Sequence, residues 1–167
     1  GVTEPLYIFN KFCGNPAMQT APSDVNYQNA PKPFRLAELY LIAAEAYLKS
    51  GLSTGVSEGS KLLNELKSKR ITGWEEKLYS QAELQTELKN ERVRELVGEG
   101  FRLSDLKRYG NGFSRSASQD KTAISLPGQS STENLSKSAD DYRFVWPIPV
   151  AETDANPNIK QNTGYTN

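Results

Sequence analysis

Carboxylates recur at helical spacing in the run 91–109, ERVRELVGEGFRLSDLKRY, and no other run in the sequence concentrates groups suited to chemistry so densely. Glu91, Glu95 and Glu99 are each four residues apart, so on a continuous helix they share one face. Two carboxylates that flank a glycosidic bond, one acting as acid and one as base or nucleophile, carry out glycoside hydrolysis. A catalytic carboxylate pair is therefore the first hypothesis that this run raises.

Arginines in and near the same run favour a structural interpretation instead. Like charges four residues apart destabilise a helix, so the glutamates need compensating cations. The planar guanidinium of arginine holds a carboxylate through two hydrogen bonds, which lysine does not. We predict a partly buried charge network that joins the third and fourth helices and extends to the first. Its members are Arg35, Glu38, Glu91, Arg92, Arg94, Glu95, Glu99, Arg102, Asp105 and Arg108.

The amino-acid composition excludes several kinds of catalytic and metal site. The 167 residues include no histidine, which removes imidazole bases, imidazole triads and the commonest zinc ligand. Cys13 is the one cysteine, so an internal disulfide and a thiolate cluster are excluded, and we expect it to be a buried free thiol. We expect no metal, no cofactor and no catalytic residue. Twenty basic and twenty acidic residues cancel, which argues against nucleic acid as a partner.

Four helices are expected to position these charges. Pro33 and Gly51 bracket an Ala- and Leu-rich segment that is apolar almost all round, which indicates a helix buried on several sides. A second helix follows over Val56 to Arg70, and together the two form a unit typical of tetratricopeptide-like repeats. The third helix starts at Ser80, capped with Glu83, and runs to Gly98 or Gly100. The fourth spans Phe101–Tyr109.

The sequence predicts one mainly α domain with long loops and minor β-strand, in three segments. Residues 1–33 form an edge strand, over 6–12, and a loop that leads into the helices. Residues 34–110 form two helix pairs. Residues 111–167 contain a long polar loop to 139, a short strand over 142–146 and a polar tail. The chain opens at Gly1 without a leader pattern, and we interpret it as a piece of a longer protein.

The run 91–109 resembles the signature of the SusD/RagB family, E-R-x-x-E-L-x-x-E-G-x-R-x-x-D-L-x-R. It matches through Glu91, Arg92, Glu95, Leu96, Glu99, Gly100, Arg102, Asp105, Leu106 and Arg108. Segment 35–46 is similar to the family's R-x-x-E-x-x-L-x-x-A-E-A motif, and 62–70 resembles its Leu-Asn-x-x-R helix. The ending 147–165 resembles the family's PIP…E…NP…QNPGY terminus, with Thr163 where the family usually has proline.

This resemblance implies an α-helical protein that is built on tetratricopeptide-like helix pairs. It also implies that the protein is not an enzyme. Members are lipoproteins tethered by an N-terminal lipid to the outer membrane of Bacteroidetes, at the cell surface. They bind oligosaccharides for starch or polysaccharide utilisation and deliver them to a SusC-like TonB-dependent transporter. Members are longer than this chain, so the lipidation cysteine and most sugar contacts are expected outside it, and Cys13 does not fit the lipidation role.

Aromatic rings are the natural platforms for sugars, because an apolar ring face stacks on a pyranose. The candidates are Trp74, Tyr79, Phe113 and Trp146. We keep Trp74, which follows Gly73 in a turn, as a candidate ligand-binding residue, although such a Trp commonly packs on the helices beneath it. Trp146 is expected in the core. Two other functions stay open: a generic helical-repeat module for protein interaction, and a glycoside hydrolase built on Glu91 and Glu95.

Overall fold

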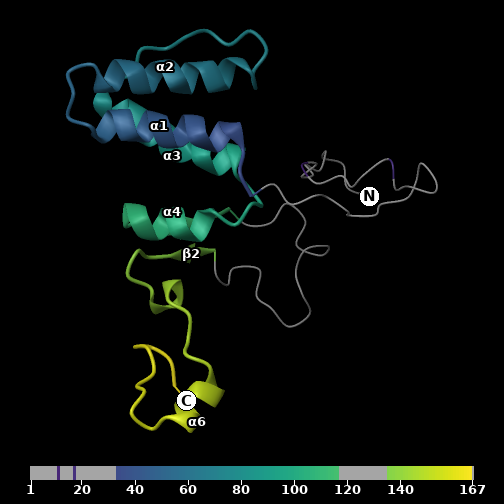
Figure 1. Ribbon diagram of the computed structural model, residues 1–167, viewed down its shortest axis with the longest axis vertical. Coiled ribbons are helices and arrows are strands. Elements are labelled where there is room, and N and C mark those ends of the chain that lie inside the picture. Colours follow the sequence, from purple (N-terminus) through teal and green to yellow (C-terminus); the bar gives the residue numbers. More distant parts are fainter. Residues whose placement is uncertain (1–10, 12–16, 18–32, 117–134, 167) are drawn as a thin grey trace. The chain divides into compact units, whose positions relative to one another are not determined.

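A computed structural model describes Lys11, Ala17 and residues 33–116 and 135–166 (Figure 1). Apart from Lys11, the predicted edge strand over 6–12 lies outside the described residues, and so does Cys13. The chain divides into two compact units, Gly1–Glu95 and Leu96–Asn167. Our prediction of a single domain, with the fourth helix paired to the third, stays a prediction because each unit is described here by itself.

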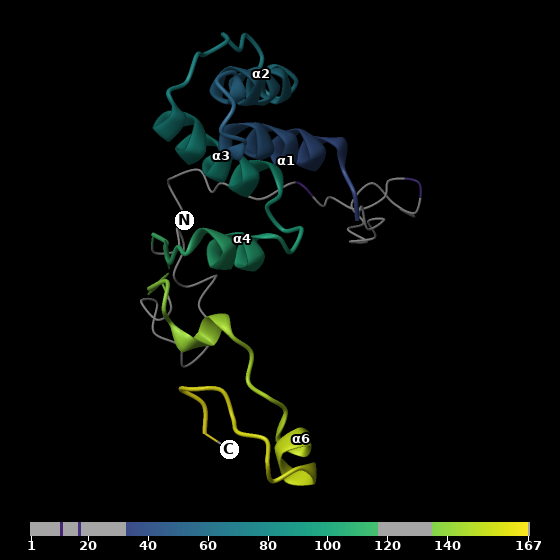
Figure 2. The same ribbon diagram turned by 60° about the vertical axis from the view of Figure 1, so that its left-hand side comes forward.

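Three helices form the described part of the first unit: α1 spans Leu36–Lys49, α2 spans Gly55–Ser68 and α3 spans Gln81–Glu95. The sequence predicted all three, with ends within a few residues. Gly51, at φ 73°, supplies the left-handed conformation that turns the chain from α1 towards α2. Helix α1 packs against both α2 and α3, as Figures 1 and 2 show from two directions. The mainly α, tetratricopeptide-like fold predicted from the sequence is confirmed.

Leucines from all three helices form the core of this unit. Leu41 of α1, Leu63 of α2, and Leu84 and Leu88 of α3 are almost fully buried. Ala37 and Ala44 are buried beside them on α1, where small side chains let the neighbouring backbones approach. Each buried leucine contributes roughly 1.5–3 kcal/mol relative to an exposed one. This packing fixes the α2 and α3 faces on which the charged residues lie.

Gly59 lies at a close approach between α1 and α2. A Cβ at this position would lie 2.9 Å from the carbonyl oxygen of Ala44 and 3.0 Å from Cδ2 of Leu84. In an open helix, Gly→Ala stabilises by about 1 kcal/mol through propensity. Here we expect Gly59→Ala to destabilise by about 1–3 kcal/mol, because the backbone of α1 must move. Urea unfolding measures the change, with exposed Ser57→Ala as control; a stabilised Gly59→Ala variant would contradict the close packing.

The N-terminus of α3 carries the capping box that the sequence predicted. Glu83 N donates to Ser80 Oγ at 3.3 Å, and Ser80 N donates to Glu83 Oε2 at 2.8 Å. The other end was predicted incorrectly. The helix stops at Glu95 and not at Gly98 or Gly100, because both glycines adopt positive φ, 76° and 86°. Glu99 and Arg102 therefore lie outside α3.

The second unit contains short elements. They are α4 (Arg102–Tyr109), β1 (Phe113–Ser114), β2 (Ser136–Lys137), the 3-10 helix η2 (Tyr142–Phe144) and α6 (Val150–Ala155). Strands β1 and β2 pair antiparallel at the two ends of the predicted polar loop. The predicted strand over 142–146 is wrong. Asp141 accepts the backbone N–H of Arg143 at 3.0 Å, and this cap starts a helical turn where the apolar residues suggested a strand.

The two halves of the C-terminal motif bind each other within this unit. Ile148 N donates to Gln161 Oε1 at 2.8 Å, and Gln161 Nε2 donates to the Ile148 carbonyl at 2.9 Å. Asn162 Nδ2 donates to the Trp146 carbonyl at 2.7 Å. With its backbone held in this way, the Trp146 side chain is 80% exposed, so its predicted place in the core is wrong for this structure.

Candidate functional site

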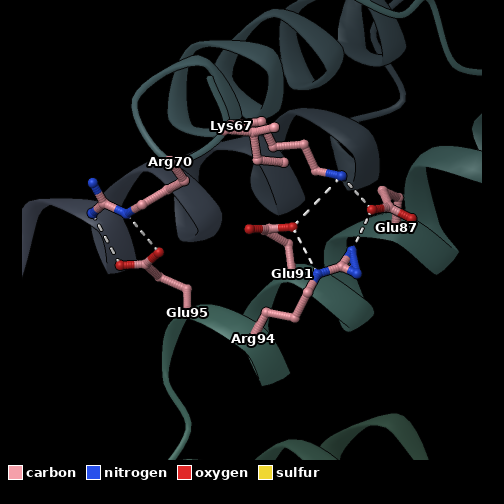
Figure 3. A pocket seen from close by; sticks show the side chains of 7 residues that line it. Lys67, Arg70, Glu87, Glu91, Arg94 and Glu95 are labelled. Carbon is pink, nitrogen blue, oxygen red and sulfur yellow. Dashed lines mark hydrogen bonds and ion pairs between the residues drawn. The ribbon is translucent and has the colours of Figure 1, made fainter. Parts of the chain in front are cut away.

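Charged side chains of α2 and α3 line a hollow of about 510 Å³ in the first unit (Figure 3). Lys67 lies in the last turn of α2, and Arg70 follows the end of that helix. Glu87, Glu91 and Glu95 come from one face of α3, at successive intervals of four. The lining residues are Lys67, Arg70, Ile71, Glu87, Glu91, Arg94 and Glu95.

Lys67 lies at the centre of this cluster. Its side chain is 6% exposed, and its ammonium group pairs with Glu87 and lies 3.5 Å from Glu91 Oε2. Glu91 is equally buried and also accepts a hydrogen bond from Arg94 Nε at 3.1 Å. Arg94 pairs with Glu87 as well. A buried charge requires a partner, so these two cations and two carboxylates stabilise one another across the two helices.

Glu95 forms a second cluster at the end of α3. Its carboxylate accepts Arg35 Nη1 at 2.8 Å and two donors of Arg70, Nε at 2.9 Å and Nη2 at 3.0 Å. The Glu95 carbonyl oxygen accepts Arg35 Nη2 at 2.7 Å and Lys11 Nζ at 2.8 Å, which satisfies one of the carbonyls left unpaired at a helix end. Glu95 therefore links all three helices, because Arg35 immediately precedes α1 and Arg70 follows α2.

The neighbouring lysine and arginine side chains lower the pKa values of Glu87 and Glu95. Burial raises the pKa of Glu95, but the hydrogen bonds from Arg70 and Arg35 outweigh it and hold that pKa below its ordinary value. Burial likewise raises the pKa of Glu87, and the hydrogen bonds from Lys67 and Arg94 bring it below the ordinary value. Both side chains are carboxylates at neutral pH. Neither has the raised pKa that a general acid of glycoside hydrolysis requires.

The structure places four of the predicted network residues in these two clusters, Glu91 and Arg94 in the first and Arg35 and Glu95 in the second. Glu38 is half-buried, and Arg92 is buried on α3. Asp105 is buried on α4 and accepts Arg108 Nε at 2.7 Å, an ion pair within one helix of the second unit. Glu99 is half-buried and Arg102 exposed in that unit. A link between the third and fourth helices stays a prediction.

Sequence reasoning missed Lys67 and Glu87 as members of the cluster. A signal existed for Glu87, because it lies four residues before Glu91 on the face that we had identified. Lys67 gives a weaker signal. It lies four residues after the buried Leu63, which places it on the inner face of α2, but lysine at such a position commonly extends to solvent.

The cluster does not have the arrangement of a hydrolytic site. Glu87, Glu91 and Glu95 each contact at least one cation directly, and so their oxygens are engaged by the protein itself. Among the residues that the structure describes, no group of histidine, cysteine, aspartate and glutamate is suited to hold a metal ion. Within the same residues, no helix has both the length and the apolar character needed to cross a membrane.

The four aromatic residues considered as sugar-binding candidates differ in their contacts and in their exposure to solvent. Trp74 donates its indole N–H to Asn64 Oδ1 at 3.2 Å, and Lys67 Nζ lies 4.7 Å from its ring centre. Asn64 also accepts Lys77 N and donates to the Lys77 carbonyl, so it holds the turn that carries Trp74. Tyr79 is buried, and Phe113 packs edge-on against Phe144. Of these four rings, only that of Trp146 is largely exposed.

We propose that Trp74 stabilises the turn after α2. Trp74→Ala should lower the free energy of unfolding by about 2 kcal/mol, because the ring, its hydrogen bond and its contact with Lys67 are lost together. Chemical denaturation followed by circular dichroism measures this loss. Trp146→Ala removes the same side chain from an exposed position and should change the free energy by no more than about 0.5 kcal/mol. Equal losses in the two variants would contradict the assignment.

Comparison with known proteins agrees with this architecture. A family model described as the SusD family matches residues 3–165, nearly the whole chain. The chain belongs to the SusD family. It is 33% identical over 144 residues to the starch-binding protein SusD of Bacteroides thetaiotaomicron. A solved structure of a SusD superfamily protein from Bacteroides vulgatus superposes with a TM-score of 0.68 at 33% identity, over 89% of this chain.

The similarity covers only part of each relative. The aligned region is 86% of this chain but 23% of the starch-binding SusD, and 31% of the solved SusD superfamily chain. A second solved structure from Bacteroides vulgatus is of a protein provisionally named for sugar binding. It superposes with a TM-score of 0.62 at 32% identity, and the match covers 80% of this chain and 28% of that protein's chain. This SusD-family chain thus spans less than a third of the length of these relatives.

Proposed function

We propose that the complete protein containing this chain binds oligosaccharides without hydrolysing them. The observation that carries the proposal is the family match over residues 3–165, together with 33% identity to a protein named for starch binding. The geometry is consistent with a binding protein, because the carboxylates of the α3 cluster are held in ion pairs and not offered to a ligand. This chain acts as part of the helical scaffold, and we assign no sugar site to it.

The family resemblance extends the proposal to location and partner. We infer that the complete protein is a lipoprotein of the outer membrane, anchored at the cell surface by a lipid on a segment outside this chain. It delivers its oligosaccharide to a SusC-like TonB-dependent transporter. Nothing in the charge balance favours nucleic acid, since twenty basic and twenty acidic residues leave no net charge.

The test is binding by the protein expressed from its complete reading frame. Calorimetric titration with starch-derived and other oligosaccharides should show binding to at least one of them. Purification of the tagged protein from mild detergent extracts should also recover an outer-membrane barrel. Absence of both results would leave the generic protein-interaction module as the better explanation. Release of shorter sugars by the wild type, abolished in a folded Glu91→Gln variant, would establish the hydrolase instead.

A further inference from the structure

Asn111 and Gly112 form the one Asn-Gly pair in the sequence, and they connect the end of α4 to β1. The Cγ atom of an asparagine and the backbone nitrogen of the next residue can close a five-membered ring, which makes asparagine a thermolabile residue. Glycine in the second position favours this closure, because it has no Cβ to obstruct the approach and its backbone is conformationally free.

The fold requires glycine at position 112. A Cβ there would overlap the carbonyl oxygen of Lys137 and would lie 3.0 Å from Cα of Ser138. The strand pairing sets this close approach, since Phe113 of β1 lies opposite Lys137 of β2. Both contacts are with backbone atoms, which cannot move aside as the end of a flexible side chain can. The pairing of β1 with β2 therefore keeps a glycine directly after Asn111.

The Asn111 side chain is open to solvent, and in the described part of the chain it makes no hydrogen bond. Its backbone, in contrast, is held by the cap of α4. Asn111 N donates to the Leu106 carbonyl at 2.9 Å, and Gly110 N donates to the Lys107 carbonyl at 3.1 Å. Water therefore reaches the side-chain amide, and no hydrogen bond from the described residues fixes it away from the next backbone nitrogen.

We propose that Asn111 deamidates spontaneously through a cyclic imide. The backbone nitrogen of Gly112 attacks Cγ of Asn111, an N–Cγ bond forms, and the Cγ–Nδ2 bond breaks. The amide nitrogen leaves as ammonia and takes the proton of the Gly112 N–H. A water molecule then opens the ring at either carbonyl and leaves aspartate or isoaspartate at position 111. The reaction needs water alone as co-reactant, and the inference does not depend on sugar binding.

The product changes the end of α4. The C-terminal end of a helix carries a partial negative charge, which Lys107 and Arg108 complement in the last turn of α4. A carboxylate at position 111 adds a negative charge at this end. Isoaspartate also lengthens the backbone by one methylene group between the α4 cap and β1. Deamidation is therefore expected to weaken the cap.

Ageing of the folded chain at mildly alkaline pH, followed by tryptic digestion at mildly acidic pH and mass spectrometry, tests the proposal. Trypsin releases the peptide 109–115, YGNGFSR, in which Asn111 is the one side-chain amide. Asn64 is the internal control, because it is buried and forms hydrogen bonds with Lys77 and Trp74. Asn111 should deamidate about tenfold faster than Asn64 or more, since Asn64 reacts only when its surroundings open.

The products and a matched variant make the test specific. Both aspartate and isoaspartate should form at position 111, identified by comparison with synthetic peptides. Asn111→Gln keeps the amide and Gly112 but would have to close a six-membered ring, so its amide should stay intact over the same period.

Three results would overturn the proposal. An intact Asn111 in the folded chain, under conditions that convert the synthetic peptide 109–115, would mean that the fold keeps the amide away from the Gly112 nitrogen. Aspartate formed without isoaspartate would exclude the cyclic imide. Loss of the amide at the same rate in Asn111→Gln would show that closure of a five-membered ring does not control the reaction.

Discussion

Replacing Lys67 by methionine is expected to lower the free energy of unfolding by about 3–5 kcal/mol. Methionine is also unbranched and of similar length. The fall in the free energy of unfolding therefore measures the effect of removing the positive charge. Without the ammonium group, the one charged partner left to Glu91 among the described residues is Arg94, whose side chain is 52% exposed, while the Glu91 side chain is 6% exposed. A buried carboxylate whose one remaining partner is an exposed arginine lowers the stability of the folded state. Urea or guanidinium unfolding at neutral pH measures the effect.

Two variants make this prediction specific. Lys69→Met changes the same residue type at an exposed position two residues on and should cost less than about 0.5 kcal/mol. Lys67→Met combined with Glu91→Gln removes both charges together, and the amide oxygen can still accept from Arg94. The double variant should recover most of the lost stability, because removing a complete buried pair is often close to neutral. A double variant less stable than Lys67→Met would contradict a direct interaction between Lys67 and Glu91.

Glu95→Gln is expected to cost about 2 kcal/mol at neutral pH, since it weakens charge-assisted hydrogen bonds from both Arg35 and Arg70. The pKa of Glu95 is lowered in the folded chain, so its contribution to stability is complete above the ordinary value of 4.5. It is lost as the pH falls through the lower folded pKa. The difference in stability between wild type and Glu95→Gln should therefore be largest near neutrality and shrink in acid.

Unfolding measured from pH 7 down to pH 3 gives this profile, with exposed Glu75→Gln as the matched control. The control should change the free energy of unfolding by no more than about 0.5 kcal/mol at neutral pH. A constant difference between wild type and Glu95→Gln across the range would show that the side-chain amide, and not the lost charge, causes the destabilisation. A difference that grows in acid would contradict the lowered pKa.

The sequence predicted the parts of the structure that depend on local pattern. The bounds of α1, α2 and α4 follow from apolar spacing and from glycine or proline at the ends, and the Ser80–Glu83 capping box is a short-range signal. Glu91 and Glu95 were placed on one α3 face by their spacing alone. The identity of the family also came from ordered motifs. These features need no knowledge of which helix packs against which.

The rest depended on tertiary contacts that a single sequence does not specify. Lys67 and Glu87 are twenty residues apart, and their pairing exists because α2 and α3 both pack on α1. Glu99 lies outside α3, which ends at Glu95 before Gly98 and Gly100 adopt positive φ, whereas the pattern allowed the helix to continue. Trp146 looked like a core residue from its apolar neighbours. Gln161 and Asn162 instead donate hydrogen bonds to the carbonyls of Ile148 and Trp146, and the Trp146 ring is exposed.

We infer that the charged run of α3 holds the helices together and does not touch the ligand. The most direct test is the oligosaccharide dissociation constant of the complete protein, measured by calorimetry for the wild type and for Lys67→Met combined with Glu91→Gln. We predict binding by both, with constants within about twofold of each other. A folded double variant that binds more than about tenfold more weakly, or not at all, would contradict the claim and place the ligand at this cluster.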